Sequence, residues 1–380
     1  SSRAGPRASH ARAGRRRKPP LSCGESAAEP QRVMPLVDLL AYSGAALDLA
    51  ALAGPRVSRR LRAAAAGSAR SLSVALAALE RRLLPRLYIC ASSGSDASFV
   101  GRLCPEKEAW EPMPPMTVPR WAPAMAAAGG RLYVCGGFSG EGRSGHRSAE
   151  CFDPPSSTWR SLPPMLIPRQ NLAVAALGGR IYACGGRDGA DRPLSSAECY
   201  DPASRAWCLL PPMSTPRFAF AAASLQRRLH ACGGCDWAGC ALRSAEYFDP
   251  LLGVWEELPA MAEARSMHGA AGLAGGLYAC GGVDSVGRSL TTAERLVWVA
   301  GRWAWERLPT MSVPRGAPAV AAMAGAVYVC GGRADSPHTD EEDALASAER
   351  FDPEKGTWAP APPLPVASCF AAAAALWVAR

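Results

Sequence analysis

The chain has 380 residues, of which 48% are hydrophobic and 20% are charged, and its formal net charge is +9. This length allows one large domain and a smaller segment, and the composition is typical of a packed globular protein. No apolar stretch reaches the roughly 18 uninterrupted residues of a transmembrane helix, so we expect no membrane partner.

The positive charge is concentrated in the N-terminal quarter. Residues 1–86 carry 16 Lys/Arg and 5 Asp/Glu, whereas residues 87–380 carry 26 and 28. A nucleic-acid-binding groove needs clustered positive charge on the binding domain itself, so we expect no nucleic-acid partner. Residues 1–33, with the run Arg15-Arg16-Arg17-Lys18, are predicted to be a disordered basic tail, and a nuclear-import or nucleic-acid patch is the alternative.

Residues 34–86 are predicted to be helical. Apolar residues recur at helical spacing after Pro35, a short second helix follows, and Val57-Ser58-Arg59-Arg60-Leu61-Arg62 opens a third piece. This order resembles an F-box, and the resemblance implies that the segment docks on the adaptor subunit of a cullin-type ubiquitin ligase. Gly54-Pro55 departs from the family pattern, and an Ala-rich helical cap on the following domain is the alternative. The matching adaptor-binding residues are Pro35, Leu36, Leu39, Leu40, Leu49, Leu52 and Val57.

From Leu87 onward the chain repeats one unit about every 48 residues. A unit has an apolar run closed by two glycines, a Ser/Thr-Ala-Glu step, usually an Asp-Pro turn, a Trp, and a Pro-rich exit that mostly ends in Pro-Arg. A period of roughly 40 to 50 residues with four short apolar runs is typical of propeller blades. The apolar runs start at Leu87 (a degenerate copy), Leu132, Ile181, Leu229, Leu277 and Val327.

These units resemble the kelch repeat, and the resemblance implies an all-β, six-bladed propeller over residues 87–380. The Ala-rich stretch 369–377 is predicted to form the innermost strand of the first blade and so to close the ring, because closure removes an open sheet edge. The alternative is that residues 72–79 supply that strand and the C-terminal stretch begins a truncated blade.

Six of the 14 cysteines occupy one register of successive repeats, so they lie apart around the ring and cannot pair as disulfides. We expect small buried apolar residues in a reducing compartment, the cytoplasm or the nucleus. Cys235 and Cys240 are close enough in sequence to join in a disulfide or bind a metal, but no partner spacing supports this. The six are Cys90, Cys135, Cys184, Cys232, Cys280 and Cys330.

No catalytic constellation is recognisable. The five histidines are scattered over different repeats and the tail, and no phosphate-binding loop is present. Galactose oxidase is a propeller enzyme with kelch-type repeats, but its Tyr and His copper ligands cannot be mapped here. The acidic stretch Asp340-Glu341-Glu342-Asp343 is expected to be a solvated loop, with a cation site as the alternative. We therefore predict a protein that is not an enzyme and has no cofactor or metal.

The candidate partner-binding residues lie at the Pro-Arg exits. In kelch substrate receptors the matching arginines surround the channel mouth and bind acidic segments, because guanidinium groups suit carboxylates. The alternative is an ion pair with the equally periodic Glu150, Glu198, Glu246, Glu294 and Glu349. The exits lead into the innermost strands, so we expect them to lie beside the loops of variable length that join the second and third strands at 138–147, 187–195, 235–243, 283–291 and 333–346. The predicted site comprises Arg120, Trp121, Arg169, Asn171, Arg217, Phe218, Arg265 and Arg315, with Gln170 and Met267 as further selectivity candidates.

The leading interpretation is a substrate-recognition subunit of a cullin-type ubiquitin ligase that binds an acidic or phosphorylated protein segment. A kelch scaffold without a ligase link is the second interpretation, and a propeller enzyme is the third.

Overall fold

The computed structural model describes residues 83–93, 97–138, 145–334 and 344–379. The predicted tail, and the predicted helical segment up to residue 82, lie outside these residues. Residues 83–86 were predicted to end the helical connector and instead form the start of the first strand. They are extended because Leu83 to Arg86 pair with Ala379 to Leu376 of the last strand.

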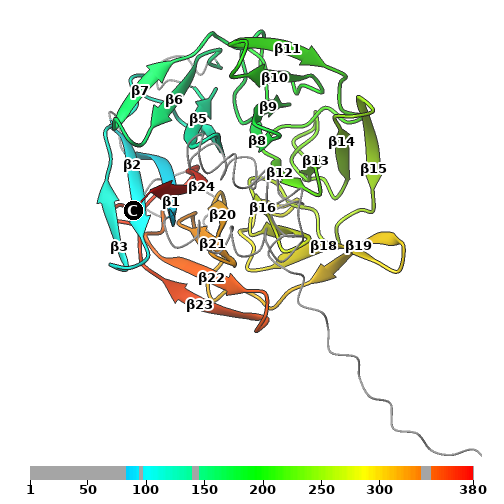
Figure 1. The fold of residues 1–380 in the computed structure, drawn as a ribbon. Helices are drawn as coiled ribbons and strands as arrows, with labels where there is room; N and C mark the ends of the chain where they lie inside the picture. The colour runs from blue at the N-terminus through cyan, green and yellow to red at the C-terminus, as the bar shows by residue number, and fades with distance from the viewer. Residues whose placement is uncertain (1–82, 94–96, 139–144, 335–343, 380) are drawn as a thin grey trace, which may run out of the picture. The chain divides into compact units, whose positions relative to one another are not determined.

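The described residues form six four-stranded antiparallel sheets arranged around a central channel (Figure 1). We call the sheets blades and number them so that blade 1 contains β24 and β1–β3. Blade 2 contains β4–β7, blade 3 β8–β11, blade 4 β12–β15, blade 5 β16–β19 and blade 6 β20–β23. The innermost strand of each blade packs against the innermost strands of both neighbouring blades, so the ring is closed. The predicted all-β, six-bladed propeller is therefore confirmed.

The strand bounds follow the repeat. The innermost strands are β24 (Ala372–Ala379), β4 (Ala124–Ala128), β8 (Ala173–Leu177), β12 (Ala221–Leu225), β16 (Gly269–Leu273) and β20 (Ala319–Met323). The second strands are β1 (Leu83–Ser93), β5 (Arg131–Cys135), β9 (Arg180–Cys184), β13 (Arg228–Cys232), β17 (Gly276–Cys280) and β21 (Ala326–Cys330). The third strands are β2 (Ala97–Cys104), β6 (Ala149–Asp153), β10 (Ala197–Asp201), β14 (Ala245–Asp249), β18 (Ala293–Val299) and β22 (Ala348–Asp352). The outermost strands are β3 (Ala109–Pro112), β7 (Thr158–Ser161), β11 (Ala206–Leu210), β15 (Val254–Leu258), β19 (Arg302–Arg307) and β23 (Thr357–Ala361).

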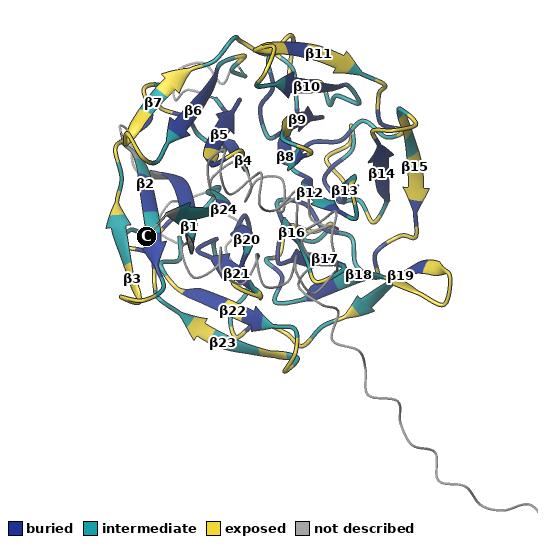
Figure 2. Cartoon of the chain, in the orientation of Figure 1, coloured by how far each residue is buried: buried dark blue, intermediate teal, exposed yellow. Residues whose placement is uncertain are grey.

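Side-chain size and burial follow the distance from the axis. The innermost strands are rich in alanine, because six strands converge there, and they line a channel space of about 190 Å³. The second and third strands are almost completely buried between neighbouring blades, whereas the outermost strands combine exposed and partly buried residues (Figure 2). The core is thus a set of layers between blades, each built from the apolar runs that define the repeat.

Six tryptophans of the outermost strands join each blade to the one before it. The indole Nε1 of Trp159, for example, donates to the carbonyl oxygen of Pro114 at 2.9 Å, and its ring lies 5.1 Å from that of Phe152. The same hydrogen bond runs from Trp110 to Pro362, so the series also crosses the seam between blades 6 and 1. The ambiguity in the fifth repeat is resolved in favour of Trp305, which donates to Pro259.

The first blade is assembled from two distant parts of the chain. β24 pairs with β1 over eight residues, from Cys90↔Ala372 to Leu83↔Ala379. The prediction that the C-terminal Ala-rich stretch closes the ring is therefore confirmed. The alternative of a truncated extra blade is wrong, because β24 is the innermost strand of blade 1.

Candidate functional site

One face of the ring carries both the loops after the second strands and the exits that lead into the innermost strands. In five blades the residue after the exit arginine forms an isolated bridge with the residue after the double glycine. The exits and the variable loops therefore lie side by side. The bridged pairs are Trp121–Phe138, Gln170–Arg187, Phe218–Cys235, Ser266–Val283 and Gly316–Arg333.

The double glycines are required where a second strand meets the next exit. Gly185 has φ +56°, and a Cβ added to it would lie 2.6 Å from the carbonyl oxygen of Arg217. Any larger residue would force blades 3 and 4 apart at this point. Gly186 uses the same close approach to donate its N–H to that oxygen at 2.9 Å.

The five exit arginines are buried, and none is more than 1% exposed. Arg169 is representative of the group. Its Nη1 donates to the carbonyl oxygens of Gly185 and Ser196, both at 2.8 Å, and its Nε donates to Oε1 of Glu198 at 2.8 Å. The guanidinium group therefore ties the exit of its own blade to the second and third strands. The buried arginines are Arg120, Arg169, Arg217, Arg265 and Arg315.

The prediction that these arginines present their charge to a partner at the mouth is wrong. Each contacts a glutamate that is itself at most 5% exposed, as the alternative interpretation required. The glutamate also accepts a backbone N–H from the loop before the exit, as Glu198 does from Leu166 at 2.6 Å. In these five blades the arginine of the exit and the glutamate of the third strand pair with each other in the interior, so neither is accessible to a partner.

Blade 1 lacks this ion pair, and both partners are replaced. The exit position is Ser368, which is 2% exposed, and the glutamate position in β2 is Gly101. The ring of Phe99 fills the adjacent space, since a Cβ on Gly101 would lie 2.5 Å from its Cζ. The sequence indicated the missing arginine but not the matching loss of the glutamate, because the degenerate repeat hides the register of β2.

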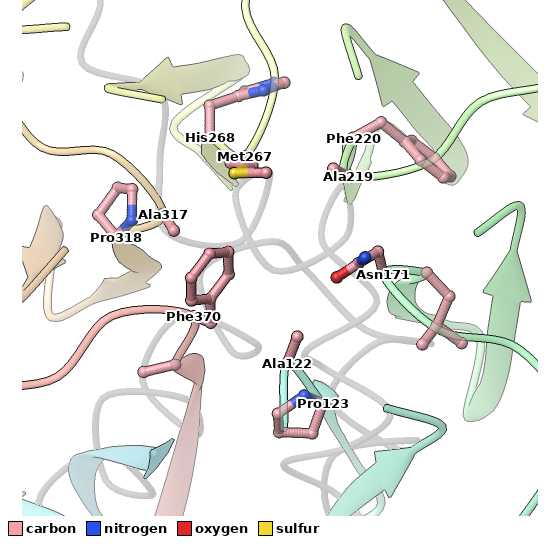
Figure 3. Close-up of a pocket in the computed structure, with 12 residues that line it drawn as sticks. Ala122, Pro123, Asn171, Ala219, Phe220, Met267, His268, Ala317, Pro318 and Phe370 are labelled. Atoms are coloured by element: carbon pink, nitrogen blue, oxygen red, sulfur yellow. The ribbon is translucent and has the colours of Figure 1, made fainter. Parts of the chain in front are cut away.

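The mouth of the channel is formed by the residues two positions after each exit arginine, by the residue two positions after Ser368 in blade 1, and by the residues that follow them. All six of these positions have φ between +45° and +56°. Backbone hydrogen bonds link neighbours around the opening, from Ala219 N to Asn171 O, Met267 N to Ala219 O, Ala317 N to Met267 O and Phe370 N to Ala317 O. These residues, which we call the mouth ring, surround a cavity of about 110 Å³ (Figure 3). The mouth ring consists of Ala122, Asn171, Ala219, Met267, Ala317 and Phe370.

Large and small side chains alternate around the mouth ring. Blades 2, 4 and 6 contribute alanine, whereas blades 3, 5 and 1 contribute Asn171, Met267 and Phe370 (Figure 3). The three large side chains are therefore separated by gaps where an alanine leaves room. The left-handed backbone is unfavourable for bulky residues, so Met267 and Phe370 are held there by the surrounding structure.

The other predicted selectivity residues surround the mouth ring at different depths. Trp121 is half-buried, whereas Phe218 is 5% exposed and lies under the guanidinium of Arg187 at 3.6 Å. The Gln170 side chain donates to Asp191 at 3.0 Å. Asn171 and Met267 belong to the mouth ring. Phe370 was missed, because its exit lacks the arginine that marks the position in the other blades.

Cys232 and His268 meet beneath the mouth, with Sγ and Nε2 3.5 Å apart. Burial raises the pKa of Cys232 to about 12 and lowers the pKa of His268 well below its usual value. Both groups are therefore neutral at pH 7, and the contact lacks the thiolate that nucleophilic chemistry needs. The His268 ring points away from the opening in Figure 3, which fits a packing role.

The predicted adaptor-binding residues Pro35 to Val57 lie outside the described residues. Within the described part of the chain, no group of three or more His, Cys, Asp or Glu side chains is placed to hold a metal ion. In the same residues no helix has the length and the apolarity that a membrane span requires.

Comparisons with known proteins agree with this architecture. The Kelch motif model matches residues 120–166, 168–214, 216–262 and 314–365, together just over half of the chain. The solved structure of YjhT has a similar fold, with a TM-score of 0.62, 14% identity, and coverage of 72% of this chain and 94% of that one. A search of curated proteins gave no match. Four motif matches in register with blades 2, 3, 4 and 6 show that the chain belongs to the Kelch-motif family.

Proposed function

We propose that the chain is a protein-interaction module that binds a protein segment at the face with the mouth ring. Kelch propellers generally bind protein partners. The observation that carries this proposal is the contrast between a backbone repeated from blade to blade and the loops beside it, which differ in length and chemistry. Variable loops on a rigid scaffold are where recognition is expected. The mouth offers alanine, Met, Phe and amide side chains, which suit binding by packing and hydrogen bonding, and we propose no catalytic role.

We further propose that the chain is the substrate-recognition subunit of a cullin-type ubiquitin ligase, in which the F-box-like segment 34–62 holds the adaptor. The order of residues in that segment supports this role. A scaffold without a ligase link is the second candidate, and it is favoured by the Kelch matches, which all fall C-terminal to residue 119. The cysteines buried on the second strands are unpaired, which supports a reducing compartment, the cytoplasm or the nucleus.

A capture experiment with purified adaptor separates the two candidates. The intact chain is compared with Leu39→Asp/Leu40→Asp and with the control Leu251→Asp/Leu252→Asp. The control changes another leucine pair, which is 85% and 68% exposed on a turn of blade 4. We expect the adaptor to capture the intact chain and the control, and not to capture the Leu39/Leu40 variant. Equal capture of all three chains, or capture of none, excludes the ligase role.

Recognition by the mouth face has its own test. Trp237 and Val286, 66% and 73% exposed, lie at the tips of the loops of blades 4 and 5. Partners that co-purify with the intact chain should be lost from Trp237→Ser/Val286→Ser. They should be retained by the Leu251/Leu252 variant, because that turn lies at the opposite end of its strands. If both variants retain the partners, the mouth face is not the surface that recognises them.

A further inference from the structure

Two arginines at the rim of the mouth ring differ in their ion pairing among the residues that the structure describes. Arg187 and Arg333 occupy the same position, directly after the double glycine of their blades. Arg187 donates to both carboxylate oxygens of Asp191, at 2.8 and 2.9 Å. Among the described residues Arg333 has no carboxylate partner, whereas the Nε atoms of both arginines are buried without a hydrogen bond. A buried donor without a partner costs free energy, which a ligand can recover.

Arg333 also lies close to Phe370, a residue of the mouth ring. Its guanidinium carbon lies 5.9 Å from the centre of the Phe370 ring, within the range of a cation–π interaction. The ring of Phe370 borders the cavity together with Met267 and Asn171. One positive group and three large side chains therefore converge on the seam between blades 6 and 1 and on the adjacent opening.

The cavity is too small for more than one side chain. Its volume is about 110 Å³, which is smaller than the apolar cavity of about 150 Å³ that takes up a single benzene. Met267 and Phe370 supply polarisable and aromatic surface, and the Asn171 amide supplies a donor and an acceptor for a peptide backbone. The hydrogen bonds of the mouth ring hold these groups in place before a ligand arrives, which reduces the entropy lost on binding.

We propose that the mouth ring binds one aromatic or large aliphatic side chain of a protein partner, and that Arg333 pairs with an acidic residue next to it. The apolar side chain enters between Met267 and Phe370, Asn171 bonds to the partner backbone, and the carboxylate meets Arg333 at the rim. This assignment rests on the proposed function, recognition by the same face, and it names the chemistry of the recognised segment.

The test uses three blocked dipeptides and the full chain with ¹³C-methyl methionine. The chain has 10 methionines, and the signal of Met267 is identified by its absence from Met267→Leu. N-acetyl-Asp-Phe-amide is compared with N-acetyl-Asp-Ala-amide, which lacks the aromatic ring, and with N-acetyl-Lys-Phe-amide, which reverses the charge. We expect the Asp-Phe dipeptide to shift the Met267 methyl to saturation, the Asp-Ala dipeptide to leave it unchanged, and the Lys-Phe dipeptide to bind about tenfold more weakly.

One variant copies a residue that other blades have at the equivalent position. Phe370→Ala introduces the residue found at the equivalent position of blades 2, 4 and 6, so the fold is expected to persist, and melting temperature checks this. Phe370→Ala and Arg333→Gln should each weaken binding of the Asp-Phe dipeptide by about tenfold. The control Arg288→Gln removes a 76%-exposed cation, paired with Asp284, from the same face, and it should bind normally.

Three results with the dipeptides would overturn the proposal. These are an equal response to the alanine dipeptide, equal binding of the lysine dipeptide, and no response of Met267 to any dipeptide. A Met267 signal that shifts with protein concentration alone would place a second copy in the mouth, which also contradicts it. If partners are lost from the loop-tip variant but not from Phe370→Ala, recognition by this face stands and the present assignment falls.

Discussion

Arg169 and Glu198 form an ion pair 2.8 Å long in which both side chains are 0% exposed. Removal of one member leaves the other charge buried without its partner, which typically costs about 3–5 kcal/mol. We therefore expect Arg169→Met to lower the free energy of unfolding by about that amount, measured by urea denaturation. The control Arg192→Met removes an arginine that is 64% exposed and pairs with Asp188, and it should change the free energy by less than about 1 kcal/mol. Similar losses in the two variants would show that the buried pair is not a structural element.

Blade 1 supplies a variant that removes both charges at once. It has Ser368 and Gly101 where the other blades have Arg and Glu. We expect Arg169→Ser/Glu198→Gly to lose less stability than the sum of its two single variants, because neither charge is then left alone. A double-mutant cycle by urea denaturation measures the difference. Strict additivity would contradict a direct coupling between the two side chains.

The buried cysteines should be inert to thiol reagents. Burial raises the pKa of Cys135, Cys184 and Cys280 to about 12, so almost no thiolate exists at pH 8. Cys208 and Cys240 are exposed. Brief treatment with iodoacetamide, followed by peptide mass spectrometry, should modify Cys208 and Cys240 and should reach the other three only in denaturant. Modification of Cys184 in the native protein at the rate of Cys208 would show that the blades open.

His230 should make the protein less stable in mild acid. It is 0% exposed at a position where other blades have tyrosine, and burial lowers its pKa to about 4. Its contribution is therefore fully present above the unfolded-state pKa of 6.5 and is lost as pH falls towards 4, because the unfolded state then binds the proton. At pH 5 the loss should reach about 2 kcal/mol.

The matched variant copies a neighbouring blade. In blade 3 the same cross-strand pair is Tyr182 and Cys199, whereas in blade 4 it is His230 and Tyr247. His230→Tyr/Tyr247→Cys keeps the paired volume of blade 3 and removes the titrating group. Its free energy of unfolding should fall less than that of the wild type between pH 7 and pH 5, by about 2 kcal/mol. Parallel pH profiles of the two proteins would assign the acid sensitivity to other groups.

Closure by β24 predicts a large effect of a small deletion. Without residues 369–380, β1 would expose an unpaired edge and the core around Tyr88 and Cys90 would lose Ala374 and Leu376. We expect the shortened chain to lose its cooperative thermal transition and to bind a hydrophobic dye. A melting curve like that of the full chain would show that the ring is stable without β24, the strand of eight residues that closes it.

The repeat predicted the fold because its signals are local and periodic. The apolar runs, double glycines and tryptophans each fix one strand, and six copies fix six blades. The buried arginines were misjudged for the same reason, because a periodic Arg and a periodic Glu indicate contact only when the register of strands far apart in sequence is known. Phe370 follows an exit that lacks the arginine, and Arg333 lies in a loop that varies from copy to copy, so their meeting at the mouth depended on the ring geometry and was not readable from spacing.

Blade 1 is assembled from two distant parts of the chain, and this has a consequence for folding during synthesis. Its strands β1–β3 end at Pro112 and β24 begins at Ala372, about 260 residues later. At ribosomal rates of roughly 5–20 residues per second, β1 waits on the order of 10–50 s for its partner. Blades 2 to 6 can assemble during this interval as a growing arc, whereas the first blade remains three-stranded with its inner edge uncovered. The nascent chain is therefore most exposed to mispairing at the strand that emerges first, and the last ring strand to leave the ribosome ends that exposure.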